Sequence, residues 1–246
     1  MRLTVLGGCG AFPGPGAACS GYLVEHDGFR LLIDPGYAVL PRLVQIIGAT
    51  ELDAVLVSHG HPDHCADLNP LLRARAFRDE PPEPLPVYAP PDALAAVLAL
   101  DRKGMLDDHL VVHDIDPGDR FTVGPFDVRS WLLPHSLPNA GLRLTADGKA
   151  LAYTGDTGPS PDLVNLAKGA DLYLAEATYP RHMPADLERS LSTASLAGRT
   201  AAQADAGRLV LTHLWPGTDH ADSLAAAAED YAADIAVAVP GLVVEV

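Results

Sequence analysis

The stretch SHGHPDHCADL, residues 58–68, places three histidines and an aspartate within six residues, directly after the apolar run DAVLV. The apolar run predicts a buried strand that ends close to His59. In an extended chain, residues i and i+2 project to the same side, so His59 and His61 can reach one metal ion. Asp63 and His64 begin the next predicted helix and can face a second point nearby. Imidazole and carboxylate ligands suit Zn, Fe or Mn, so the stretch predicts a metal centre without selecting the metal.

Three further candidate ligands lie beyond this stretch, each at the end of an apolar β-like run. They are His135 in LLPHS, Asp156 in AYTGDTG and His213 in VLTHLW. We expect them on the same rim of a sheet as the first four. Seven donors match the need of two metal ions when one carboxylate bridges them and open positions hold water.

Composition and charge restrict the classes of partner. The chain has 246 residues, 48% hydrophobic, and a net charge of −15. A protein that binds a phosphate backbone usually has a basic face, so long nucleic acids are not expected partners. No apolar run is long enough to span a membrane, and the first residues lack a secretory pattern, so a cytoplasmic location is expected. The expected substrate is a small anion, attracted by bound cations.

Short β-like runs alternate with helical ones along the whole chain. This order predicts one α/β domain that spans residues 1–246. The expected strands include residues 2–7, 21–27, 29–36, 53–59, 110–115, 170–179 and 208–213. The expected helices are residues 38–48, 63–77 with a bend at Pro70, 92–100, 192–207 and 222–235.

The motifs described so far closely resemble those of the metallo-β-lactamase superfamily. The matching pieces are SHGHPDH, the downstream His135, the TGDT turn with Asp156, and LTH with His213; DPG at 34–36 also matches a loop that the family places near its metals. The resemblance implies a four-layer αββα sandwich with the metals at the edge of the sheets. It also implies two divalent metal ions, with Zn expected first and Mn or Fe as alternatives.

The resemblance also implies a ligand assignment: one metal ion is held by His59, His61 and His135, the other by Asp63, His64 and His213, with Asp156 between them. Two metal ions that share a water lower its pKa from about 15.7 toward neutrality and so produce a hydroxide nucleophile. Asp63 and Asp156 are the expected catalytic residues, with Asp63 orienting the nucleophile as well as binding metal.

Two branches of the superfamily fit the motifs less well. The true lactamases have a cysteine where this chain has Asp156, and the diiron electron-transfer branch has a glutamate where this chain has His61. An aspartate in the bridging position favours hydrolases of phosphodiesters or thioesters.

Among phosphodiesterases, the chain is similar to the tRNA 3′-processing nuclease, with three departures. Ala175 replaces a histidine of that nuclease's HEAT motif, and Leu191 replaces another that is thought to protonate the leaving group. The 20 residues between His135 and Asp156 are too few for a tRNA-gripping arm. The chain is more similar to small bacterial relatives of the cyclic-nucleotide phosphodiesterases, so a small phosphodiester such as a cyclic nucleotide is the expected substrate.

Five further residues are expected to bind the substrate. Arg143 and Arg181 can hold a phosphate, Tyr179 and Trp215 can stack on a base, and His182 can replace the missing proton donor, as can His220. Three other functions stay open: a tRNA-processing type of RNA endonuclease, a glyoxalase II-like thioester hydrolase, and a non-catalytic metal-binding protein. Because relatives of this fold often pair, a homodimer is also possible.

Overall fold

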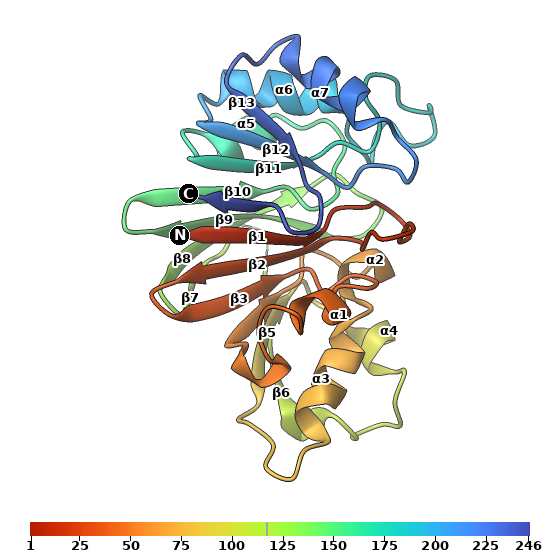
Figure 1. Ribbon diagram of the computed structural model, residues 1–246, viewed down its shortest axis with the longest axis vertical. Helices are drawn as coiled ribbons and strands as arrows, with labels where there is room; N and C mark the ends of the chain where they lie inside the picture. The colour runs from red at the N-terminus through yellow and green to blue at the C-terminus, as the bar shows by residue number, and fades with distance from the viewer. Residues whose placement is uncertain (117) are drawn as a thin grey trace.

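Two β-sheets pack face to face in the computed structural model, which describes residues 1–116 and 118–246 (Figure 1). The first sheet has seven strands in the order β14 (Val243–Glu245), β1 (Arg2–Gly7), β2 (Gly21–His26), β3 (Phe29–Ile33), β4 (Ala54–Leu56), β5 (Leu85–Ala89) and β6 (Leu110–Asp114). The second also has seven, in the order β13 (Asp234–Val237), β12 (Arg208–Thr212), β11 (Leu172–Glu176), β10 (Lys149–Tyr153), β9 (Asn139–Ala146), β8 (Phe126–Leu133) and β7 (Arg120–Val123).

Alternation along the strands builds the layer between the sheets. Leu142 and Leu144 on β9 point inward and join a buried cluster with Leu3, Val5 and Phe126. Residues of opposite parity point outward, because successive side chains of a strand face opposite sides of a sheet. The inner faces therefore form the central core, and each outer face needs its own cover.

Helices provide that cover on both sides. The first sheet is covered by α1 (Leu40–Leu43), η1 (Ala49–Glu51), α2 (Pro62–Cys65), α3 (Leu68–Ala76), α4 (Ala95–Leu98) and η2 (Asp107–His109). The second is covered by α5 (Asp162–Ala167), α6 (Ala194–Gln203) and α7 (His220–Ala228). Figure 1 shows α1, α3 and α4 on one side of the sandwich and α6 and α7 on the other. This arrangement confirms the predicted four-layer αββα sandwich.

Each sheet combines antiparallel and parallel pairing. β1, β2 and β3 pair antiparallel, whereas β3 to β6 pair parallel. In the second sheet, β7 to β10 pair antiparallel and β10 to β13 parallel. The turn between β9 and β10 is Asp147-Gly148, and both residues have positive φ (49° and 75°), as a tight hairpin turn requires.

Four helix predictions were wrong in detail. The helix predicted over 92–100 is limited to Ala95–Leu98, and the helix predicted over 222–235 lies at His220–Ala228. The helix predicted over 38–48 is limited to Leu40–Leu43, because the β-branched residues after it, among them Val44 and Ile46, are poor helix formers. The helix predicted over 63–77 does not bend at Pro70: it is split between Cys65 and Leu68. Pro70 lies in the first turn of α3, where a backbone N–H has no partner within the helix.

Candidate metal centre

The seven predicted ligands come from four strand ends that meet at one edge of the sandwich. His59 and its neighbours follow β4, His135 follows β8, Asp156 follows β10 and His213 follows β12. β10 and β12 run parallel in the same sheet, so their carboxyl ends lie at the same edge. His213 has φ of 57°, in the left-handed region that non-glycine residues seldom adopt. This backbone turn directly follows β12 and carries the imidazole of His213.

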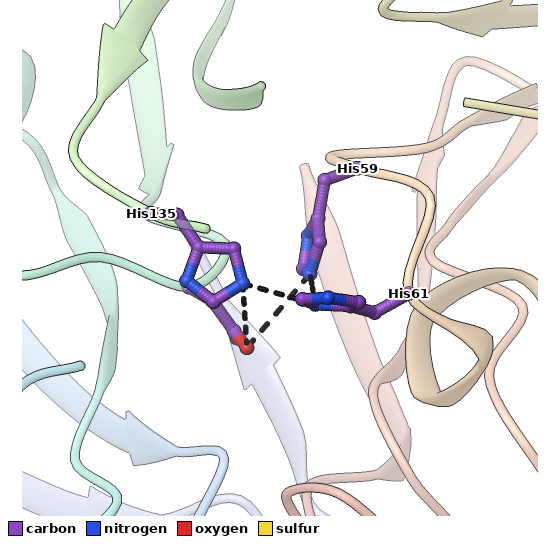
Figure 2. Close-up of side chains that lie close together, drawn as sticks. His59, His61 and His135 are labelled. Atoms are coloured by element: carbon purple, nitrogen blue, oxygen red, sulfur yellow. Dashed lines mark hydrogen bonds and ion pairs between the residues drawn. The ribbon is translucent and has the colours of Figure 1, made fainter. Parts of the chain in front are cut away.

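Three histidines form the first ligand cluster. Nδ1 of His61 lies 3.0 Å from Nε2 of His59 and 3.0 Å from Nε2 of His135. Figure 2 shows the rings of His59 and His61, from one stretch of the chain, converging with the ring of His135 from another. Oδ2 of Asp156 completes the cluster, 3.8 Å from His59 Nε2 and 3.9 Å from His135 Nε2. These donor atoms all lie within 4.8 Å of one another.

Two histidines and two carboxylates form the second cluster. Nε2 of His213 lies 3.2 Å from Oδ2 of Asp63 and 3.2 Å from Oδ2 of Asp156. Nε2 of His64 lies 3.2 Å from Oδ1 of Asp156. Asp156 therefore belongs to both clusters: its Oδ2 lies near His59, His135 and His213, and its Oδ1 lies near His64.

The hydrogen-bonding state of these atoms fits metal ligands. Nε2 of His64 and Oδ1 of Asp156 are fully buried, and apart from the 3.2 Å contact between them neither has a hydrogen-bond partner within the described residues. A buried polar atom without a partner costs about 1–3 kcal/mol, so its retention calls for a ligand. Imidazole nitrogens and carboxylate oxygens in sets of four match the donor number and type of zinc and related divalent ions.

Further side chains hold the histidines in orientation. Oδ2 of Asp34 lies 2.8 Å from Nδ1 of His64, which leaves His64 Nε2 facing the cluster. Asp34 also accepts hydrogen bonds from the Ser58 N–H and hydroxyl, at 2.7 Å each, and from the Tyr153 hydroxyl at 2.6 Å. A carboxylate behind a histidine ligand fixes its tautomer and raises its basicity.

The other orienting partners are neutral. The hydroxyl of Ser58 lies 3.1 Å from Nδ1 of His59. Nδ1 of His135 donates to the Ser190 carbonyl at 2.7 Å. Nδ1 of His213 lies 3.0 Å from the hydroxyl of Thr178, which itself donates to Glu176 at 2.7 Å. Each contact leaves the opposite ring nitrogen free to face the cluster.

Burial and neighbouring charges set the protonation states. Burial lowers the pKa of His59, His61 and His135, so these imidazoles stay neutral, the form that binds metal. Burial opposes ionisation of Asp156, but the His213 and His64 rings hold its pKa well below its usual range. The first cluster thus combines neutral imidazoles with an ionised carboxylate. In the second cluster burial opposes protonation, but the Asp156 carboxylate raises the pKa of His64 and His213 above the usual value.

The N-terminal loop also reaches the second cluster. The backbone N–H of Ala11 donates to Oδ2 of Asp63 at 2.8 Å. Gly10 packs on the ring of His213, where a Cβ would lie only 2.7 Å from the ring atoms. The sequence pattern does not identify Asp34, Thr178, Ser190 or Ala11 individually as orienting residues. Only Asp34 lies in a motif that indicates a position near the metals, the DPG loop directly after an apolar strand.

The predicted substrate-binding residues fall into two groups. Tyr179 and Trp215 lie at the cluster edge: Tyr179 follows Thr178, and Trp215 is two residues after His213. Their rings stack with centroids 5.9 Å apart at 16°, and Phe12, next to Ala11, packs edge-on against Trp215.

The structure does not bring the predicted arginines to the clusters. The guanidinium of Arg143 donates to the carbonyls of Leu166 and Lys168 at 2.9 Å each, on the outer side of β9. Arg181 forms an ion pair with Glu229 at 2.6 Å. His182 is an exposed residue in the segment before α6, and His220 is an exposed residue at the start of α7.

Comparison with known proteins decides the family. Residues 29–214 match the model of the β-lactamase superfamily domain. The chain belongs to the β-lactamase superfamily. It is 32% identical over 217 residues to the probable metallo-hydrolase YhfI of Bacillus subtilis, with 87% of each chain covered. The crystal structure of YhfI superposes with a TM-score of 0.90 at 30% identity and covers 99% of both chains.

A second relative is named for a different activity. The chain is 28% identical over 283 residues to a ribonuclease Z of Kineococcus radiotolerans, with 95% of this chain and 90% of that protein covered. Within the described residues, no helix of this superfamily member is both long and apolar enough to cross a membrane.

Proposed function

We propose that the protein is a dinuclear metal-dependent phosphodiesterase that hydrolyses a small phosphodiester such as a cyclic nucleotide. The observation that carries the proposal is the pair of four-donor clusters that share the Asp156 carboxylate. The first ion is assigned to His59, His61 and His135, the second to Asp63, His64 and His213, and Asp156 lies between them. We expect Zn in both positions, with Mn or Fe as alternatives.

Bound divalent ions would lower the pKa of a water toward 7 and polarise a phosphoryl oxygen. Residues of the chain itself would orient the attacking water and bind the substrate. Asp63 is held by the Ala11 N–H and by His213, so its carboxylate is fixed where it can orient the attacking water. The stacked rings of Tyr179 and Trp215 beside the second cluster provide a platform for an aromatic part of the substrate.

Of the steps in hydrolysis, protonation of the leaving group has the least support from side chains at this site. Ala175 is buried in β11, Leu191 is half-buried, and neither side chain can donate a proton. His182 is an exposed titratable side chain three residues after Tyr179 and is our candidate for the donor. We therefore expect nitrophenyl esters, whose leaving groups need little protonation, to be hydrolysed faster than alkyl esters.

An RNA endonuclease is the second candidate, because a ribonuclease Z is 28% identical over 95% of this chain. Two features weigh against it. Strands β9 and β10, joined by a two-residue turn, fill most of the segment between His135 and Asp156, which leaves no room for an RNA-binding arm. The net charge of −15 also opposes binding to a long phosphate backbone.

A substrate panel tests the proposal. The metal-loaded protein is assayed with bis-nitrophenyl phosphate, cyclic nucleotides, a tRNA precursor and lactoyl-glutathione, alongside His61→Ala and the control His109→Ala, a half-exposed histidine far from the clusters in sequence. Turnover of the first two substrates that His61→Ala loses and His109→Ala keeps is the expected result. Preferential cleavage of the tRNA precursor or of the thioester would overturn the proposal, and no metal-dependent turnover would leave a metal-binding protein. A cytoplasmic homodimer remains a prediction.

A further inference from the structure

A cavity of about 660 Å³ opens on the outer face of the second sheet, over β7, β8 and β9 and beside α5. None of the seven cluster residues lines it. Its lining contains four cationic side chains, Arg120, Arg129, Arg143 and Lys168, and one acidic side chain, Asp127. This concentration of positive charge stands out in a chain that has 17 basic and 32 acidic residues.

The strand register places three of these arginines in one row. Arg120 on β7 is directly opposite Arg129 on β8, and Arg129 is directly opposite Arg143 on β9. Directly opposite residues on neighbouring strands share a face, and like charges in such pairs are destabilising. Neighbouring strands lie about 4.8 Å apart, so the backbone positions of the row span about 10 Å.

No acidic side chain in the described residues forms a close ion pair with the row, although Asp127 also lines the cavity. Neither its arginines nor Lys168 has an ion-pair partner there. Six other arginines in the described residues do form ion pairs: Arg2, Arg30, Arg73, Arg181, Arg199 and Arg208. Within the described residues, five arginines outside the cavity also lack an ion pair, so the row is distinguished by the direct cross-strand adjacency of its unpaired arginines.

Two guanidinium groups of the row are already fixed in place. Arg129 lies over the ring of Trp131, 4.4 Å from its centroid. Nη1 of Arg143 is held by the carbonyls of Leu166 and Lys168, which leaves its other N–H donors available. Fixing side chains before binding reduces the entropy lost when a ligand arrives.

We propose that this cavity is a binding site for a small linear oligophosphate, separate from the metal centre and independent of the reaction catalysed there. Guanidinium groups recognise phosphate through paired N–H donors. The row presents positive charge over about 10 Å, which suits several linked phosphates better than a single one. The volume lies in the range of small-molecule sites. Because Arg129 covers the Trp131 ring, recognition depends on charge and not on stacking of a base.

The test is calorimetric titration of the metal-loaded protein with tripolyphosphate at low and high salt. We expect one site that persists in His61→Ala and that weakens at least tenfold in the double variant Arg120→Gln/Arg129→Gln. Arg120→Lys/Arg129→Lys should bind within threefold of the wild type, and Arg199→Gln, which removes an exposed paired arginine, should bind as the wild type does. Arg120→Gln alone relieves like-charge repulsion, so it should not lower the melting temperature of the protein without ligand. If the double variant does not fold, this single variant replaces it in the titration and should also weaken binding.

Several outcomes would overturn the proposal. Binding that disappears in His61→Ala but survives in Arg120→Gln/Arg129→Gln would place tripolyphosphate at the metal centre. Monophosphate binding as tight as that of tripolyphosphate would show a single-phosphate site. If a short oligoribonucleotide displaces tripolyphosphate at a concentration below that of tripolyphosphate, the cavity is an RNA-binding site. If tripolyphosphate shows no detectable binding at millimolar concentration, the cavity is not a phosphate-binding site.

Discussion

The two halves of the molecule share one plan but contribute to the metal centre in different ways. Each half has antiparallel strands followed by three parallel pairings, with helices outside. The first half supplies four ligands from the single stretch 59–64, whereas the second supplies His135, Asp156 and His213 from the ends of three separate strands. The ligands of the first half therefore form a local sequence motif, whereas those of the second half come together only once the sheet has formed.

The halves also differ in how they orient their histidines. The first half uses a buried carboxylate, Asp34, with three other donors around it. The second half uses neutral groups, the Thr178 hydroxyl and the Ser190 carbonyl. Because a buried charge is costly to leave half-satisfied, the first half should be the less tolerant of change.

The largest effect is expected from loss of a ligand in either half. His61→Ala and His213→Ala should each lower kcat/KM by about 1,000-fold or more, since a bound metal supplies several kcal/mol of transition-state stabilisation. Steady-state kinetics on bis-nitrophenyl phosphate measures this, with His109→Ala as control. Full activity in His213→Ala would mean that the second half does not contribute a ligand.

A smaller effect should separate the orienting groups. Asp34→Asn should lower metal affinity by about 10- to 100-fold, because the amide cannot accept from all the donors that surround Asp34. Thr178→Val, which removes one neutral partner of His213, should cost about tenfold at most. Competition with a chelator gives both affinities. If Thr178→Val is the more damaging of the two, the proposed asymmetry between the halves is wrong.

The aromatic platform of the second half should affect substrate binding more than chemistry. Trp215→Leu should raise KM for a cyclic nucleotide by about fivefold or more, since base stacking is worth about 1–3 kcal/mol, and should leave kcat within about twofold. Tyr88→Leu, which alters a ring stack with His113 on β6 and Phe121 on β7, is the matched control. A drop in kcat without a change in KM would contradict a binding role for Trp215.

The smallest effect is expected at Arg143 and Arg181, the two arginines predicted from the sequence to bind the phosphate of the substrate. Arg143 binds carbonyls at the end of α5, and Arg181 is paired with Glu229. Arg143→Gln and Arg181→Gln should therefore change kcat/KM by less than about threefold, because surface ion pairs and distant charges contribute little. A tenfold loss in either variant would show that its guanidinium reaches the substrate.

The same contrast explains how far the sequence could predict the structure. The strand predicted over 2–7 matches β1, and the strand ends brought all seven predicted donors together, because apolar periodicity marks where each strand stops. Side-chain direction was harder to predict. The parity that turns Leu142 inward turns Arg143 outward, and it became clear only once the register of β8, β9 and β10 was known.

Local sequence patterns were the second limit on predicting the structure. Apolar spacing over 38–48 resembles a helix, but only Leu40–Leu43 is helical: Leu43 is buried at its end, and Ile47 is buried after the turns that follow. Asp34 has φ of 51° directly after β3, and nothing in its immediate sequence reveals that it lies behind His64. Contacts between segments distant in sequence decide both features.

Elemental analysis of the purified protein tests the central claim most directly, with the wild type compared with Asp156→Asn and His109→Ala. Asp156 is the one residue that both clusters share. We expect two divalent ions per chain in the wild type and in His109→Ala, and a loss at both positions in Asp156→Asn. A wild-type chain that stays free of metal when zinc, manganese and iron are supplied, or an Asp156→Asn chain that keeps both ions, would contradict the dinuclear centre.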